Sequence, residues 1–223
     1  MSVVDFRVWI PVERWREQRA VIAVLPLVGV IGGMGNFRRG LSLLSLSSRI
    51  EKAFKIKGLA GVALAVNSPG GSPVQSALIS KRIRDLAQEK DIPVYAFIED
   101  VGASGGYWLA CAADHIYAQS TSIVGSIGVV SGGFGFVEMI SKLGIERRLH
   151  SAGEKKVMLD PFSPEKPSHV KHLKNLQSEM HEEFKKMVRE RRAGKLKGEE
   201  KELFSGTFWT GQKAMEMGLI DDL

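Results

Sequence analysis

Two strand-like runs that end directly in glycine-rich loops constrain this chain more than any other feature of its sequence. GVALAV (residues 61–66) is apolar throughout and is followed by NSPGGSP (67–73), while PVYAFI (93–98) precedes GASGGYW (102–108). Strands that are apolar on both faces are typical of parallel sheets covered by helices. Ligands in such sheets bind at the carboxyl ends of the strands. The sequence therefore predicts that the two glycine loops meet at one edge of a sheet.

Strand-like and helix-like segments alternate along the chain, as in βαβ units with right-handed crossovers. Strands are expected at Ala20–Ile31, Gly61–Val66, Pro93–Ile98, His115–Ala118, Ile127–Val130, Ile145–Leu149 and Leu219–Ile220. Helices are expected at Leu41–Lys57, Val74–Lys90, Phe134–Leu143, Pro164–Arg192 and Gly211–Met217. The pattern predicts an α/β fold, with one domain over residues 20–223 and an N-terminal extension over residues 1–19.

The formal net charge of +6 raises the question of a nucleic-acid partner. In the charged region of residues 165–202, however, acidic and basic side chains are interspersed and aromatic residues are sparse. A single narrow apolar stripe indicates one long helix there, opened by Ser163, Pro164 and Glu165 as cap, proline and acid. No helix-turn-helix, zinc-finger or RNA-binding pattern occurs. We therefore expect a solvated helix face and no nucleic-acid partner, and leave association with a membrane surface open.

The chain shows no sign of a targeting or membrane-spanning segment. Residues 1–19 lack the order of a signal peptide. The most apolar stretch, Ala20–Met34, is shorter than the roughly 20 residues that a membrane helix needs. Cys111 is the single cysteine, so a disulfide and a cysteine-based zinc site are excluded, and His169 and His172 have no third metal ligand nearby. We expect a soluble protein, cytoplasmic or peripheral to the membrane, without metal or cofactor.

Ser104 is the candidate nucleophile because it is the central residue of G-x-S-x-G, formed with Gly102 and Gly106. A strand precedes the motif and a helical run follows it, which is the setting that exposes a nucleophilic serine. Backbone N–H groups of the two glycine loops are then placed to stabilise an oxyanion. The alternative is that this turn merely connects a strand to a helix.

A nucleophilic serine needs a base, and two kinds are open from the residues alone. His150 is the least unsuitable histidine for a Ser-His-Asp triad. The other base is a lysine, which must be neutral, so burial has to lower its pKa from about 10.4. Lys156 stands out because an apolar triplet follows it within the segment 153–162.

Five motifs in a fixed order carry a family resemblance. From about Ile22 to Leu223 they are NSPGGS, DVGASGGYW, SIVGSIGV, GEKKVMLDPF and WTGQKAMEMGLID. Together they resemble the S49 peptidases, the family of signal peptide peptidase A (protease IV). The resemblance implies a ClpP/crotonase-like fold of repeated β-β-α and βαβ units, here with a long charged C-terminal helix, and a Ser-Lys dyad.

The resemblance also implies the roles of particular residues. The serine of A-S-G-G-Y is Ser104, the nucleophile, and the lysine three residues after Gly153 is Lys156, the general base. Lys155 stands where the family has an aromatic residue. The serine of G-S-I-G, Ser126, would orient the lysine. The oxyanion N–H groups would come from Gly71 or Gly70, and from Gly105.

The family implies ring-like homo-oligomers in which catalytic groups of neighbouring subunits meet at the interface. Its substrates are peptides with small or apolar side chains, which here suggests signal peptide remnants. Three other functions stay open. They are an esterase of the α/β-hydrolase type using a Ser-His-Asp triad, an acyl-CoA enzyme on the same fold, and a non-catalytic scaffold whose long helix docks a membrane partner.

Overall fold

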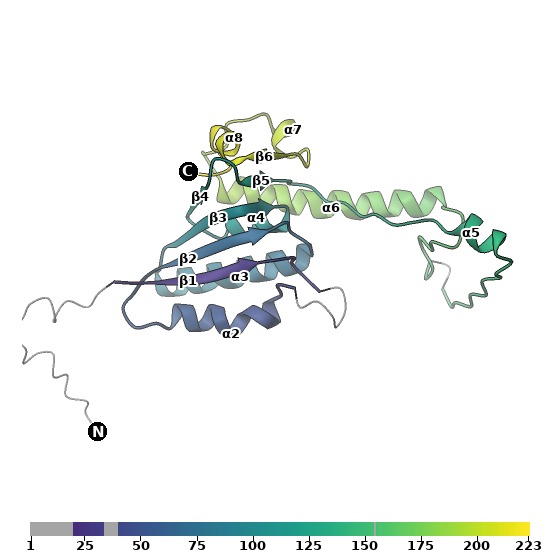
Figure 1. Cartoon of the computed structure of the whole chain (residues 1–223), viewed down its shortest axis with the longest axis horizontal. Helices are drawn as coiled ribbons and strands as arrows, with labels where there is room; N and C mark the ends of the chain where they lie inside the picture. Colours follow the sequence, from purple (N-terminus) through teal and green to yellow (C-terminus); the bar gives the residue numbers. More distant parts are fainter. Residues whose placement is uncertain (1–19, 34–39, 154) are drawn as a thin grey trace, which may run out of the picture.

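A computed structural model describes residues 20–33, 40–153 and 155–223, so the extension over residues 1–19 and the end of the apolar stretch at Met34 lie outside it (Figure 1). One mostly parallel sheet has the strand order β1-β2-β3-β5-β6, and β4 also pairs with β3. Its strands are β1 (Val21–Val28), β2 (Leu59–Ser68), β3 (Val94–Ala103), β4 (His115–Ala118), β5 (Ile123–Gly125) and β6 (Phe208–Thr210). Only the pairing of β5 with β6 is antiparallel among these strands of the described chain. The predicted α/β fold class is confirmed.

The helices of the described residues are α2 (Leu43–Phe54), α3 (Pro73–Lys90), α4 (Gly105–Ala110), α5 (Val137–Lys142), α6 (Pro167–Arg191), α7 (Glu200–Leu203) and α8 (Gly211–Glu216). Of these, α2, α3 and α4 pack against one another and cover one face of the sheet. Along β1 the burial alternates, because Leu25 and Leu27 face the helices while Val24 and Val28 are exposed. β2 and β3 place Leu64, Val66 and Ala96 in the same core. Burying this apolar area is the main force that holds the sheet against the helices.

The strand register brings three loops to one edge of the sheet. Ser68 of β2 is paired with Gly102 of β3, and Ala103 of β3 is paired with Gly125 of β5. All three strands are parallel, so their carboxyl ends lie side by side. The loops that begin after Ser68, Ala103 and Gly125 therefore start next to one another, as the glycine-loop pattern predicts.

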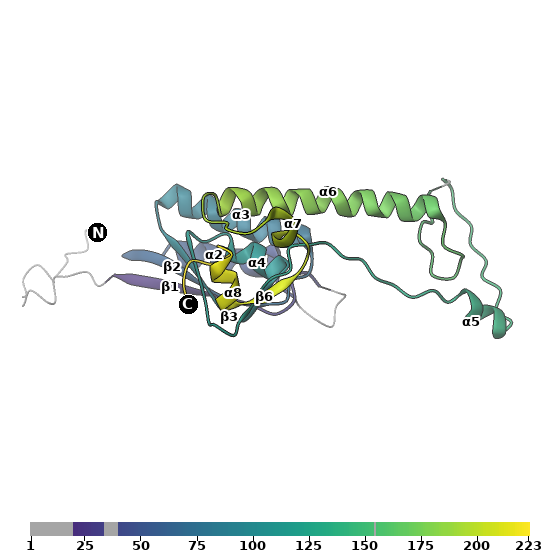
Figure 2. The same cartoon turned by 90° about the horizontal axis from the view of Figure 1, so that it is seen from above.

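A long arm projects from the sheet and the helices packed on it, which together form the body of the molecule. It comprises residues 129–183, which include an extended segment, α5, the loop after α5 and most of α6 (Figures 1 and 2). The buried residues of α6, Phe184 and Val188, are near its C-terminal end, where Phe184 stacks on Trp108 of α4 with 4.7 Å between ring centroids. α5 has no buried residue. The arm is thus fixed to the body at one end and projects from it at the other.

Three short strands that the sequence predicts are absent from the described chain. In place of Ile127–Val130 the strand is β5, which ends at Gly125 because the next residue, Ser126, has a φ of 54°. Ile145–Leu149 lies exposed in the arm without a neighbouring strand. Leu219–Ile220 is buried, but it lies in the turn after α8. These strands were predicted from the pattern of apolar residues alone, but a strand forms only where a neighbouring strand pairs with it.

The long helix also starts later than predicted. α6 begins at Pro167, with Lys166 at the N-cap position and no side-chain cap. The Ser163 hydroxyl, predicted as the cap, instead donates a hydrogen bond to Asp160 at 2.9 Å. Proline at the first helical position still fits the predicted start pattern, shifted to the second proline. Within the described residues no helix is both long and apolar enough to cross a membrane.

Arg192 fastens the end of α6 to the body through buried polar contacts. Its side chain is 2% exposed and its Nη1 lies 2.7 Å from Asp221 Oδ2. Its Nε and Nη2 also donate to the Gly218 carbonyl, at 3.1 and 2.9 Å. Lys195 is a second cation beside Asp221, at 2.8 Å. A buried pair with this many hydrogen bonds is costly to break because the remaining partner stays buried.

Replacing Arg192 with methionine should lower the free energy of unfolding by about 3–5 kcal/mol, because Asp221 and the Gly218 carbonyl lose their buried donors. The measurement is urea-induced unfolding. The matched control is Arg189→Gln on the same helix, whose bidentate partner Glu200 is 63% exposed. That exposed pair should contribute less than about 1 kcal/mol. Equal losses for the two variants would contradict this account of the anchor.

Acid should weaken the same anchor. Burial alone would raise the pKa of Asp221, but hydrogen bonds from Arg192, Lys195 and the Ile116 N–H outweigh it and lower the pKa from 3.8 to about 2. A carboxyl with a depressed pKa stabilises the fold above its unfolded pKa and loses that contribution as pH falls toward the folded value. The stability gap between the wild type and Asp221→Asn should therefore shrink by about 1 kcal/mol from about pH 6 to about pH 3. A gap that stays constant over this range in urea titrations would refute the assignment.

Candidate active site

Ser104 occupies a sharp turn between β3 and α4. Its φ of 52° and ψ of −123° are unusual for a residue other than glycine. Its N–H donates to the Gly125 carbonyl at 2.8 Å, and its carbonyl accepts from the Trp108 N–H at 3.0 Å. The hydroxyl makes no capping hydrogen bond to α4. Strained backbone of this kind persists only where the surroundings hold it, and here it turns the half-buried serine out of the strand end.

The first glycine loop packs directly against this turn. Gly70 has a φ of +100°, and a Cβ added to it would lie 2.7 Å from the Gly105 N and 2.8 Å from the Ser104 Cβ. Real side chains do not tolerate such distances, so the two loops can meet only with glycine at this position. The predicted approach of the two glycine loops is present in the structure.

Backbone hydrogen bonds distinguish Gly70 from Gly71, the two candidate oxyanion donors on the first glycine loop. Gly70 donates its N–H to the Ser68 hydroxyl at 3.2 Å. Its neighbour Gly71 is bridged to Ile31, but the bridge uses the Gly70 carbonyl and the Ser72 N–H, leaving the Gly71 N–H out. Gly105 is the first residue of α4, where N–H groups have no acceptor inside the helix. Gly71 and Gly105 are therefore the better pair of donors, and their role stays a prediction.

Ser126 lies beside Ser104 at the same edge of the sheet. It follows Gly125, which pairs with Ala103 immediately before Ser104. Its φ of 54° is again positive, and its N–H donates to the Thr207 carbonyl at 2.8 Å. The two serines thus follow paired positions of parallel strands and leave their strands through similar turns.

Lys156 is not brought to Ser104 within one chain. It lies in the loop after α5, its side chain is exposed, and its N–H donates to the Gly153 carbonyl at 3.1 Å. Figure 2 shows α5 and this loop beyond the free end of α6, away from the sheet. The structure therefore gathers Ser104, Gly70, Gly71, Gly105 and Ser126 but places the predicted base elsewhere.

The histidines form no triad with Ser104 in the described part of the chain. His150 is exposed on the arm, and His115 is exposed on β4, stacked on Tyr95 with 5.8 Å between ring centroids. His181 lies on α6, and its Nε2 is 3.0 Å from the carbonyl of Ile127, the residue after Ser126. A carbonyl accepts only, so this imidazole nitrogen donates and ties α6 to the end of the serine turn. Nothing in the helical pattern around His181 indicates that contact.

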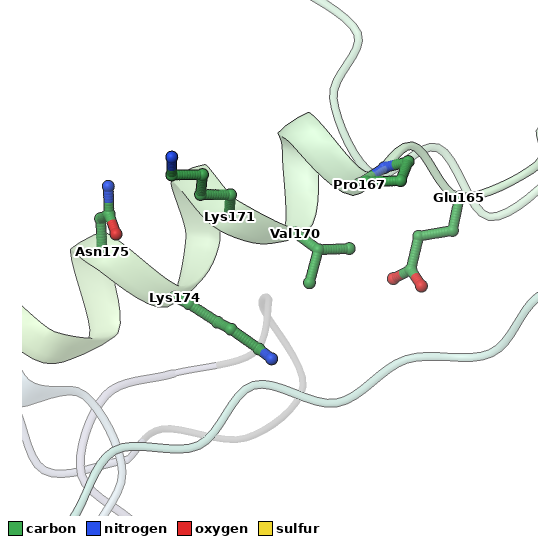
Figure 3. A pocket seen from close by; sticks show the side chains of 6 residues that line it. All are labelled: Glu165, Pro167, Val170, Lys171, Lys174 and Asn175. Atoms are coloured by element: carbon green, nitrogen blue, oxygen red, sulfur yellow. The ribbon is translucent and has the colours of Figure 1, made fainter.

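Two hollows in the surface lie away from the predicted site residues. The larger, of about 700 Å³, lies where β3 changes partner from β4 to β5, and Phe97, Glu99, Asp100 and Tyr117 contribute to its walls. The other, of about 440 Å³, lies against the start of α6 (Figure 3). Its lining consists of Glu165, Pro167, Val170, Lys171, Lys174 and Asn175. Ser104 and Lys156 contribute to neither.

The described residues contain neither a candidate metal-binding group nor an accessible thiol. No group of three or more histidine, cysteine, aspartate or glutamate side chains there is arranged to hold a metal ion. Cys111 is fully buried, and burial raises the pKa of its thiol to about 11. A thiol with that pKa is protonated at neutral pH and is a poor nucleophile.

Comparison with known proteins shows the family to which the chain belongs. The model of peptidase family S49 matches residues 86–223, which include Ser104, Ser126 and Lys156. A Brucella melitensis protein named Na(+)/H(+) antiporter NhaA is 54% identical over 212 residues, covering 93% of this chain and 29% of that protein.

Two further relatives carry peptidase names, both provisional. A Methanocaldococcus jannaschii protein named as a protease is 33% identical, covering 81% of this chain and 56% of its own length. An Enterococcus faecium protein named signal peptide peptidase SppA is 30% identical, covering 91% of this chain and 59% of its own. The chain thus spans less than two thirds of each of these relatives. This chain is a member of peptidase family S49, and it has the α/β fold with a mostly parallel sheet expected of that family.

Proposed function

We propose that this chain is a serine endopeptidase in which Ser104 of one subunit is paired with Lys156 of a neighbouring subunit. The observation that carries the proposal is the separation of the two residues within one chain. Ser104 lies in a strained turn between two glycine loops at the sheet edge, whereas Lys156 is exposed on the projecting arm. Contact with a second copy of the chain is the direct way to bring a Lys156 to Ser104, because the two residues of one chain are far apart.

The surface of the arm supports this pairing. Its exposed apolar side chains include Val130 (91% exposed), Phe134 (81%) and Leu143 (65%). Apolar side chains exposed together on a projecting element mark an interaction surface. A contact between the arm of one copy and the body of the next is head-to-tail, and such contacts form a closed ring where the rotation between copies closes. The proposal therefore includes the homo-oligomer expected from the family resemblance.

The proposed chemistry is acyl transfer to water. Neutral Lys156 accepts the Ser104 proton while the serine oxygen attacks the peptide carbonyl, and the Gly71 and Gly105 N–H groups stabilise the oxyanion. The lysine then gives its proton to the leaving amine and activates the water that hydrolyses the acyl-enzyme. Burial of the Lys156 side chain against the neighbouring subunit would favour the neutral form that the mechanism needs.

We propose peptides with small or apolar side chains as substrates, including remnants of signal peptides. Support comes from the S49 match and from the Enterococcus relative that bears a signal peptide peptidase name. Association with a membrane surface, where such remnants arise, belongs to the same proposal. The ion-transport name of the Brucella relative is not carried over. This chain matches 29% of that protein, and the family model that the chain matches is a peptidase family.

Replacing Gly70 with alanine should slow the reaction of Ser104 with a fluorophosphonate probe by about 10- to 100-fold, because the added Cβ pushes the two loops apart. The matched control is Gly29→Ala. Gly29 has a similar φ of +107° but no atom within 4 Å of an added Cβ, so it shares the backbone cost without the clash. Probe labelling is followed by mass spectrometry. Equal labelling rates for the two variants would contradict the role of loop packing.

Subunit mixing tests the pairing between neighbours. Ser104→Ala and Lys156→Met should each abolish peptide hydrolysis, and Lys155→Met is the adjacent control that keeps it. Oligomers that contain the two inactive variants in equal amounts should recover activity at about one quarter of their sites, because each site takes one group from each of two subunits. The variants are co-expressed with different affinity tags and purified through both.

The outcomes of this experiment are distinct. If the mixed oligomers stay inactive while both single variants are dead, the dyad belongs to one subunit and the pairing across subunits is wrong. If Lys156→Met keeps wild-type turnover, Lys156 is not the base and the proposed mechanism fails.

A further inference from the structure

The loop that carries Lys156 is closed by backbone turns on both sides of the lysine. Gly153 before it has a φ of +100°, and Leu159 after it has a φ of 56°. A left-handed conformation costs a residue such as leucine free energy, and it persists where neighbouring contacts enforce it. The Lys156 N–H closes the turn on the Gly153 carbonyl. Contacts close to Leu159 must therefore stabilise its left-handed conformation.

Asp160 is the anchor next to Leu159. Both of its oxygens are bound by Arg147, with Nε 3.0 Å from Oδ2 and Nη2 3.0 Å from Oδ1. The Ser163 hydroxyl and the Phe162 N–H donate to the same carboxylate. The Asp160 side chain is 5% exposed although it lies on a projecting arm. A guanidinium that contacts both oxygens of a carboxylate restricts the orientation of the pair as well as its distance.

Two aromatic rings in contact complete the anchor. The Arg147 guanidinium lies over the Phe162 ring, 4.8 Å from its centroid. Phe162 in turn contacts Phe136, the residue before α5, with 5.5 Å between ring centroids. The Phe136 N–H donates to the Pro161 carbonyl at 2.6 Å. The C-terminal end of the loop that carries Lys156 is thus joined both to the segment after α5 and to the segment before α5.

We propose that Arg147 and Asp160 are positioning residues that set where the arm presents Lys156 to the neighbouring Ser104. The inference rests on the proposed function. Asp160 is four residues after Lys156, so the position of the carboxylate determines where the intervening turn places the amine. Misplacing a catalytic group by about 1 Å costs on the order of 100-fold in rate. An ion pair whose carboxylate side chain is only 5% exposed, on an otherwise exposed arm, is suited to prevent such displacement.

The adjacent arginine provides a matched control. Arg148 Nη2 lies 2.8 Å from Glu146, and the two side chains are 76% and 72% exposed. This pair is on the same segment and has the same chemistry, but its contact is local and does not reach the lysine loop. Surface pairs of this kind contribute little. Arg148→Gln therefore removes one arginine charge from the segment without touching the anchor.

The experiment compares Arg147→Gln, Asp160→Asn, Arg147→Lys and Arg148→Gln in the full chain, using hydrolysis of a fluorogenic peptide. The Gln and Asn variants of the anchor should lose up to about 100-fold in kcat with KM changed less than about twofold. Arg147→Lys keeps the charge but not the planar guanidinium that contacts both carboxylate oxygens, so its rate should lie between those of Arg147→Gln and the wild type. Arg148→Gln should match the wild type, and all four should keep the wild-type oligomer on size-exclusion chromatography. A wild-type kcat for Arg147→Gln would overturn the inference.

A second readout separates positioning from a general loosening of the arm. Labelling of Ser104 by a fluorophosphonate probe is measured for Arg147→Gln alone, for Lys156→Met alone and for the double variant. If Arg147 acts through Lys156, the double variant labels no more slowly than Lys156→Met. A further decrease in the double variant means that Arg147 acts by another route, and the inference fails. If Lys156→Met itself labels at the wild-type rate, the proposed dyad fails instead, so the two failures are distinguishable.

Discussion

Parallel pairing of β3 with β2 on one side and with β5 on the other is the constraint from which the rest of the site follows. The pairs Ser68 with Gly102 and Ala103 with Gly125 align three strand ends at one edge. The Ser104 N–H extends this pairing by one hydrogen bond, to the Gly125 carbonyl, before the chain turns into α4. A shift of one residue in this register would exchange the faces of the strand and separate Ser104 from Gly70 and Ser126.

The arm is anchored on the same short helix that begins at the serine. α4 starts at Gly105, directly after Ser104, and its Trp108 stacks on Phe184 of α6. Arg191 at the end of α6 donates to the carbonyls of Cys111 and Ala113 just beyond α4, both at 2.8 Å. The helix that follows the Ser104 turn therefore also holds the end of α6 from which the arm projects.

Local patterns in the sequence predicted much of this arrangement. The apolar runs of β2 and β3, the helical spacing of α3 and the Ser104 turn all depend on neighbours along the chain, so periodicity and glycine placement are sufficient to predict them. Ser126 was identified through the family resemblance, and the register then placed it beside Ser104. The site is thus predictable where sequence neighbours decide the conformation.

Features that depend on distant partners were missed. β5 and β6 are three residues each, too short for a periodic signal, and they exist because they pair with each other and β5 with β3. The contact of His181 with Ile127 spans 54 positions, and the ring contact of Phe136 with Phe162 joins residues on either side of α5. The separation of Lys156 from Ser104 also depends on a distant contact, because it is set by which end of α6 packs on the body, and only the family resemblance pointed to it.

The most direct test of the account is a structure of the assembled oligomer that measures the distance from the Lys156 amine to the Ser104 hydroxyl. We expect the two atoms within hydrogen-bond reach, at about 2.6–3.2 Å, with the amine contributed by the neighbouring subunit and shielded from water. An assembly in which another side chain occupies that position, or in which Lys156 stays in solvent, would contradict the central claim.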